Sequence, residues 1–490
     1  MPAYYLEALV VILGLALLML EAFGPAHSKK AIGISAAAGL GFILIFLFFA
    51  KGPSGGNEIW PLWNFYAFDD LAKFYKGFAL VCTIFVVLMA VDYRKVLARY
   101  TDHPESEAGT GEFYCLPVFA CAGMMWMASA KDLAGAFVAL ELVTITFYIL
   151  VAYMRRNVGS LEAGVKYLIL GALSTGFLVY GIAWIYGATG TMNLAVLQDK
   201  VIGMEDSTVP LLFGVGLVMV ALGFKVGAVP MQVWIPDVYQ GSPTPTTAFL
   251  SVGSKAAGFI LLIRFLEPLL APGSPVASAV IVMLAVMAAA TLIFGNFAAI
   301  AQTNFKRLLA YSSIAHAGFL LLALASWNQG SEEMIGSKGA VSFYLATYLL
   351  MTIAAFFVLA QVRAQGDSEM IDAFDGLGKR NPMLAVAMTI IMAALAGIPL
   401  TAGFIGKFFV FLLAAESGLW WGVALAAIGA AAGFYYYFKL IRAMWWSSPA
   451  EDAKPIELPS ISGSCVAVLT TAVVVLGVWP QPILWLLGGE

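Results

Sequence analysis

Long apolar runs, separated by short polar connections, repeat along the whole of this 490-residue chain. A helix needs about 20 apolar residues to cross a bilayer, and this measure predicts about fourteen membrane spans. The expected ranges are 3–23, 31–50, 71–91, 113–130, 133–153, 161–187, 209–229, 246–266, 276–302, 306–326, 340–362, 383–414, 418–446 and 462–487. No connection between them is long enough to bury a hydrophobic core of its own. The pattern therefore predicts an all-α polytopic membrane protein without a soluble domain.

Basic residues gather in every second connection. One set of connections contains Lys29, Lys30, Arg94, Lys95, Arg99, Arg155, Arg156, Lys306, Arg307, Arg363, Lys379, Arg380, Lys439, Arg442 and Lys454. The alternate set contains only Lys51, Lys131, Lys200 and Lys338. Because positive connections tend to stay in the cytoplasm, this asymmetry predicts an even number of spans with both termini outside.

Composition agrees with this interpretation and excludes several classes of function. Hydrophobic residues make up 61% of the chain and charged residues 11%, and the mean hydropathy of +0.90 is far above that of soluble proteins. With a net charge of −3 and no basic patch, nucleic acid is not an expected partner.

The cysteines lack metal-ligand or disulfide spacing, and we interpret them as small core residues. They are Cys82, Cys115, Cys121 and Cys465. The first apolar run follows no basic signal region, so we expect it to be retained as a span.

An internal repeat predicts how the spans are organised. EAGVKYLILGALSTGF (162–177) resembles KGAVSFYLATYLLMTIAAF (338–356), and VGAVP (226–230) and KAAGF (255–259) have counterparts in the same order. Those counterparts are LAGIP (395–399) and AAAGF (430–434). We therefore predict two five-helix units, residues 113–268 (spans 4–8) and 276–446 (spans 9–13). Helices 1–3 (1–112) precede them and a last span (462–490) follows. Because five is odd, the second unit is expected to be inverted in the membrane.

Proline interrupts one span in each predicted unit, at Pro230 and Pro236 in the first and at Pro399 in the second. Proline removes a backbone donor, and the freed carbonyl groups need water, side chains or neighbouring helices as partners. Each unit is therefore expected to contain a broken helix beside a polar cavity. A simple packing kink is the alternative for either break taken alone.

Ionisable side chains lie inside several predicted spans, where they cost several kcal/mol and usually have a function. The candidates are Glu141, Lys166, Lys225, Lys255, His316 and Lys407. Lys73, Lys76 and Arg264 lie near span ends, where long side chains reach the interface, and we assign them no role.

The candidates suit proton movement, because a small change in charge or hydration moves a proton on or off a desolvated lysine. Two alternatives stay open: His316 as a hydrogen-bonded core histidine, and Glu141 with Lys225 as a static salt bridge. No phosphate loop, metalloprotease motif, nucleophile elbow or cofactor fingerprint is present, so we expect no redox or hydrolytic chemistry in this chain.

The stretch GFKVGAVPMQVWIPDVYQGSPTPTTAFLSVGSKAAGF (223–259), with KRLLAYSSIAHAGF (306–319), resembles the antiporter-like membrane subunits of respiratory complex I. The likeness extends over essentially the whole chain and is closest to the N-type family. The L type has a lateral helix after its last spans, which is not expected here. The M type has a glutamate at the position of Lys407.

This resemblance implies a proton-translocating subunit of a NADH:quinone oxidoreductase in a bacterial inner membrane, with both termini periplasmic. By the same resemblance, protons enter at Glu141 and Lys225, assisted by Lys166, pass Lys255 and His316, and leave from Lys407. No cofactor is expected in this chain, whereas FMN, iron–sulfur clusters and quinone are expected in partner subunits. The expected neighbours are M-type, K-type and J-type subunits and membrane lipid. The alternatives are a subunit of a multisubunit cation/proton antiporter or membrane-bound hydrogenase, and a structural membrane scaffold.

Overall fold

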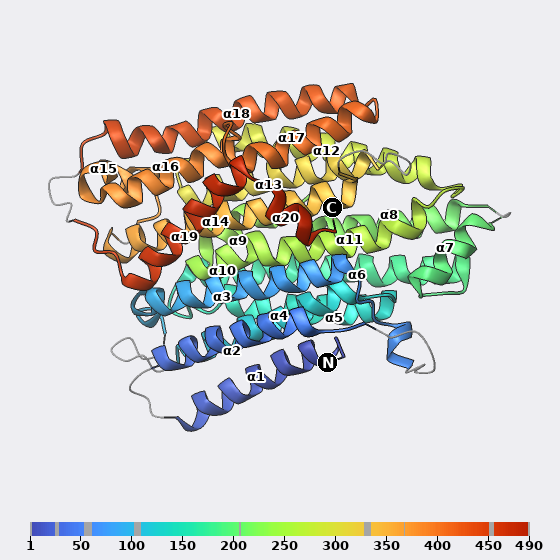
Figure 1. The fold of residues 1–490 in the computed structure, drawn as a ribbon, viewed down its shortest axis with the longest axis horizontal. Coiled ribbons are helices and arrows are strands. Elements are labelled where there is room, and N and C mark those ends of the chain that lie inside the picture. The colour runs from blue at the N-terminus through green and yellow to red at the C-terminus, as the bar shows by residue number, and fades with distance from the viewer. Residues whose placement is uncertain are drawn as a thin grey trace.

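The computed structural model describes residues 2–24, 29–52, 61–101, 109–204, 207–327, 335–366, 368–449 and 455–488. Within these ranges the ordered elements are helices, joined in places by isolated β-bridges. The helices run along one common direction and form a single bundle, with α1 and α2 at one flank and α18 at the other (Figure 1). The prediction of an all-α polytopic fold is confirmed.

Twelve helices in the described residues are long and apolar enough to cross a membrane. They are α1 (Tyr5–Phe23), α2 (Lys30–Phe49), α3 (Asp70–Ala98), α5 (Leu133–Val151), α6 (Val158–Thr189), α8 (Val209–Val226), α10 to α11 (Thr244–Leu269), α12 (Ala277–Ile300), α13 (Phe305–Ala325), α14 (Ser337–Gly366), α18 (Trp420–Trp446) and α19 (Ser460–Val478). The two other predicted spans correspond to α4 (Glu112–Ser129) and to the interrupted pair α16 (Pro382–Ala396) and α17 (Ala402–Glu416).

Shorter elements connect or interrupt these helices. They are η1 (Pro61–Asn64), α7 (Leu194–Ile202), η2 (Gln232–Trp234), α9 (Ile235–Gly241), η4 (Ile371–Phe374), α15 (Leu377–Arg380) and α20 (Gln481–Leu486). Inside the α10 to α11 span, α10 (Thr244–Phe249) passes through a π-helical segment, η3 (Leu250–Ser254), into α11 (Lys255–Leu269).

The centre of the bundle is formed by three spans. The apolar stretch of α10 to α11 is buried along its whole length, and those of α13 and α14 are 94% and 89% buried, against 28% in α1 and α12. The ionisable residues on these three spans are therefore held far from the lipid. Small residues also allow close packing of the helices around them: a Cβ atom on Gly181 of α6 would lie only 2.8 Å from the backbone oxygen of Gly214 in α8.

Both predicted helix breaks are present and have the same cap. Gly227 ends α8 with φ 81° and Gly397 ends α16 with φ 89°, a left-handed conformation that glycine adopts without a steric penalty. The next amide donates back into the helix in each case, from Ala228 to the Gly223 oxygen (2.8 Å) and from Ile398 to the Ala393 oxygen (3.0 Å). The two helices begin at opposite ends of the bundle, α8 beside α7 and α16 beside α15 (Figure 1).

The expectation that Lys76 reaches the membrane interface is wrong. Lys76 is fully buried, forms an ion pair with Glu7 of α1 and donates to the Met125 carbonyl of α4 at 3.1 Å. The Tyr66 hydroxyl donates to the same Glu7 carboxylate at 3.1 Å. These four groups are called the Glu7 cluster below. Glu7 lies 69 residues before Lys76, so its pairing could not be inferred from local spacing.

Arg264, also expected at the interface, is buried too, at 7% exposure. It binds the half-exposed carboxylate of Asp69 with two hydrogen bonds, of 2.6 and 2.5 Å. This bidentate pair ties α11 to the start of α3.

Candidate functional site

Lys255 lies at the centre of the bundle, immediately after the π-helical segment η3. Segments of this kind widen a helix locally and are frequent at functional sites. The Lys255 ammonium donates to the Ser313 carbonyl at 2.5 Å and also to the Ser313 hydroxyl, which is hydrogen-bonded to Tyr239 at 3.2 Å. Among the described residues no carboxylate forms an ion pair with Lys255. Besides the Ser313 groups, the Tyr348 ring lies nearby, with its centroid 5.5 Å from the Lys255 Nζ atom.

His316 joins three helices one turn further along α13. Its Nδ1 atom is hydrogen-bonded to the Tyr344 hydroxyl of α14 at 2.7 Å, and its Nε2 atom to the Tyr437 hydroxyl of α18 at 3.1 Å. The Tyr437 hydroxyl also bonds to Ser312, the residue beside the Lys255 partner Ser313. All of these side chains are buried. The result is a chain of proton-exchanging groups that starts near Lys255 and ends at Tyr344.

Lys407 lies on α17, just after the second break, and is 6% exposed. Its ammonium donates to the carbonyls of Leu395 and Ala396 at 2.9 and 2.8 Å, the last residues of α16. The predicted use of freed carbonyl groups is therefore observed at this break. The centroid of the Phe319 ring lies 5.3 Å from the Lys407 Nζ atom and 6.4 Å from the centroid of the His316 ring, so Phe319 is close to both groups.

Among the described residues, Lys225 and Glu141 form no ion pair with each other. Lys225 of α8 contacts α5, the helix that carries Glu141. The Lys225 ammonium donates to the Thr144 hydroxyl, and the Glu141 carboxylate accepts a hydrogen bond from Thr175 of α6 at 2.8 Å. Glu141 and Thr144 are three residues apart on one helix and share a face. Lys225 therefore binds the same helix that carries Glu141, whereas the Glu141 carboxylate is held from α6.

Lys166 is held away from this pair. It is nine residues before Thr175, about 14 Å along α6 at 1.5 Å per residue. Its ammonium forms ion pairs with Glu162 and Asp237, both at 2.7 Å. The second oxygen of Asp237 accepts from Arg307 of α13 at 2.6 Å, so Asp237 of α9 links α6 to α13.

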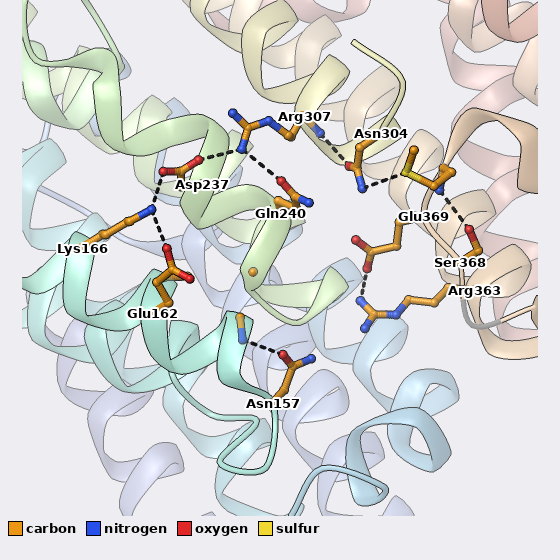
Figure 2. Close-up of a pocket in the computed structure, with 14 residues that line it drawn as sticks. Asn157, Glu162, Lys166, Asp237, Gln240, Asn304, Arg307, Arg363, Ser368 and Glu369 are labelled. Carbon is orange, nitrogen blue, oxygen red and sulfur yellow. Dashed lines mark hydrogen bonds and ion pairs between the residues drawn. The ribbon is translucent and has the colours of Figure 1, made fainter.

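A polar cavity of about 570 Å³ surrounds these ion pairs (Figure 2). Its walls include Glu162, Lys166, Asp237, Arg307, Arg363 and Glu369. Figure 2 shows Lys166 and Arg307 approaching Asp237 from opposite sides, and Arg363 directly beside Glu369 on the other side of the cavity. Burial by itself raises the pKa of Asp237, but hydrogen bonds from Lys166 and Arg307, reinforced by their charges, lower it below the usual value.

Several partners in this site were not singled out from the sequence. Asp237, Thr144, Tyr239 and Tyr437 each lie on a different helix from the group they bind. A signal existed for one of them, because three consecutive tyrosines (435–437) are unusual inside an apolar span. In the described part of the chain, no group of three or more His, Cys, Asp or Glu residues is arranged to hold a metal ion.

Known proteins resemble this chain over most of its length. Residues 130–433 match the family model described as NADH:quinone oxidoreductase/Mrp antiporter, TM. The chain is 40% identical to NADH-quinone oxidoreductase subunit N of Heliobacterium modesticaldum, over 97% of this chain and 96% of that relative.

Two solved structures show the same likeness. A chain of respiratory complex I from Thermus thermophilus has a TM-score of 0.78 at 32% identity, covering 99% of this chain and 100% of the other. A chain of the membrane-bound sulfane sulfur reductase, an archaeal respiratory membrane complex, has a TM-score of 0.84 at 27% identity, with 99% and 96% covered.

Proposed function

The chain belongs to the subunit N family of NADH-quinone oxidoreductases, and we propose that it translocates protons through its buried Glu, Lys and His residues. This membership confirms the resemblance inferred from residues 223–259. Redox chemistry in other subunits would drive the movement. The observation that carries the proposal is the hydrogen-bonded chain of Ser312, Tyr437, His316 and Tyr344 next to Lys255.

In the proposed route, Lys255 is the central relay and His316 the link toward Lys407. Lysines that are desolvated but not held by a carboxylate exchange protons more readily than fixed ion pairs do. Hydroxyl and imidazole groups can each accept one proton while donating another, so the Ser312–Tyr437–His316–Tyr344 chain can pass a proton on. From Tyr344 the proton would pass Phe319 and reach Lys407 through water molecules between the helices.

Protons would enter at Lys225 and Glu141 and leave from Lys407. Thr144 and Thr175 place hydroxyl groups beside the first pair, which supports transfer between Lys225 and Glu141. Lys166 would assist from a distance. Through Asp237 it holds α9, the segment that follows the break beside Lys225.

The exposed flank of α5 supports the proposal that a neighbouring membrane subunit packs there. Glu141 is only half-buried, and Val138, Leu142 and Ile145 on the same helix are 65%, 39% and 54% exposed. A carboxylate facing lipid is costly, so an adjacent chain covering this flank would remove that cost. The proposed neighbours are M-type, K-type and J-type subunits, with FMN, iron–sulfur clusters and quinone in the partner subunits.

We place the protein in a bacterial inner membrane with both termini periplasmic, on the strength of the basic connections. The two five-helix units, 113–268 and 276–446, would then be inverted copies. Their identical caps at Gly227 and Gly397 support this division.

The first experiment is to tag the chain, extract it in mild detergent and assay what accompanies it. We expect NADH:quinone reductase activity and flavin to co-purify with the tag. Recovery with membrane subunits only, without flavin or iron–sulfur absorbance, would instead identify a cation/proton antiporter. Ion-dependent pH changes in vesicles would then be the assay of its activity.

A further inference from the structure

An apolar groove of about 530 Å³ opens between α2, α3, α14, α19 and α20. Aliphatic and aromatic side chains line most of it, among them Leu47, Phe74, Leu349, Leu476 and Trp485. An apolar groove between membrane helices is a place where hydrocarbon chains can lie.

Only one end of the groove is charged. Asp70 and Lys73 line it there, one helical turn apart at the start of α3. In the described structure neither side chain forms an ion pair or hydrogen bond, and the Lys73 Nζ atom lies 6.0 Å from the Phe48 ring. The charged residues next to them in the sequence do have ion-pair partners: Asp69 is paired with Arg264 and Lys76 with Glu7. The groove therefore offers one positive and one negative group at its mouth.

The length of the groove matches one leaflet of a bilayer. On α3 the lining runs from Asp70 to Val81, about 16 Å at 1.5 Å per residue. Half of the bilayer hydrocarbon core is about 15 Å. At the charged end, a Cβ atom on Gly488 would lie 3.7 Å from the Asp70 carboxylate, and Trp485 is one turn away on α20. Tryptophan is typical of the membrane–water interface, so this end fits the headgroup level.

We propose that the groove binds a phospholipid with a zwitterionic headgroup, of the phosphatidylethanolamine type. One acyl chain fills the groove, the phosphate meets Lys73 and the ammonium group meets Asp70. A quinone, whose head is neutral, would leave both charges without a counterpart. An anionic headgroup without an amine would match Lys73 but be repelled by Asp70.

The test uses the intact complex, reconstituted with phosphatidylethanolamine that carries a photoreactive group on its acyl chain. Light-induced adducts are then mapped by mass spectrometry of the peptides from α2, α3, α14 and α19. We expect adducts on these helices, and about fivefold fewer in Lys73→Gln, from the loss of one charged contact. Ala346→Phe, which fills the groove, should reduce them as strongly. In the matched control, Lys200→Gln changes an exposed lysine on α7, which packs on α11 and α6, and labelling should not change.

Headgroup selectivity provides the second arm. Photoreactive phosphatidylglycerol should label the wild type about fivefold less, and Asp70→Asn should remove this difference. Equal labelling by both lipids, or labelling that Lys73→Gln leaves unchanged, would overturn the proposal. So would labelling by a photoreactive quinone in preference to either lipid, or cross-linking of the groove to another subunit.

Discussion

Lys76 and Lys255 are equally hidden, at 0% and 2% exposure, but only Lys76 has a carboxylate partner. Lys76 lies in the Glu7 cluster, where a glutamate, a tyrosine and a backbone carbonyl surround it. Lys255 has the carbonyl and hydroxyl of one serine. A buried charge with a full counter-charge is fixed in place, whereas one solvated by dipoles can lose its proton without leaving an unpaired ion behind. The difference favours a structural role for Lys76 and is consistent with the transport role proposed for Lys255.

The largest effect is expected from Glu7→Ala, which leaves the Lys76 ammonium buried without its partner. Removing one member of a buried ion pair costs about 3–5 kcal/mol, so the heat stability of the complex should fall sharply. The readout is the temperature at which the tagged chain dissociates or unfolds. The double variant Glu7→Leu with Lys76→Met should recover most of the loss. A double variant as unstable as the single one would show that the two charges do not act as a pair.

Replacing the buried lysines that lack a carboxylate partner should change stability little and lower proton translocation strongly. In Lys255→Met and Lys407→Met we expect stability within about 1 kcal/mol of wild type, because no counter-ion is left behind. Proton translocation into vesicles should fall roughly tenfold or more, since a positioned proton carrier is lost. Lys200→Met is the control for loss of a positive charge. Normal proton translocation in both variants would support the scaffold function instead.

A smaller effect is expected from Tyr437→Phe, which removes the hydroxyl that joins Ser312 to His316. Proton translocation should fall about threefold to tenfold, while water in the space left by the hydroxyl carries the remainder. Tyr435→Phe is a matched control on the same helix, because Tyr435 is 62% exposed and lies outside the buried chain. Equal behaviour of the two variants would favour the view of His316 as an ordinary core histidine.

The smallest effect on stability is expected at Lys166, which is paired with Asp237 but partly exposed. The Lys166–Asp237 pair should contribute little to stability, because water and salt screen it. Since the pKa of Asp237 is lowered in the folded state, its contribution is present above about pH 4 and is lost as the pH falls below that value. The stability difference between wild type and Asp237→Asn should therefore be largest above about pH 4 and shrink steadily as the pH is lowered from there. Asp199→Asn, at an exposed position of α7, is the matched control for the loss of a carboxylate.

The sequence was most informative where a feature is carried by one segment. Apolar length predicted the spans, proline predicted both breaks, and an ionisable residue inside an apolar run identified Lys255 and Lys407. Pairing between distant segments was not accessible in this way. Nothing near Lys76 indicates Glu7, and Asp237 meets Arg307 only because α9 packs against α13. Such partners are decided by helix packing, which a single sequence does not specify.

The two capped helix ends have an electrical consequence. The last turn of a helix carries roughly half an elementary negative charge, worth about 0.3–2 kcal/mol to a cation beside it. Lys225 lies in the last turn of α8, and Lys407 binds the last carbonyls of α16. Because these helices enter from opposite ends of the bundle, their dipoles point in opposite directions (Figure 1). Each of these lysines therefore rests against a fractional charge, which is strong enough to orient an ammonium group and too weak to hold its proton permanently.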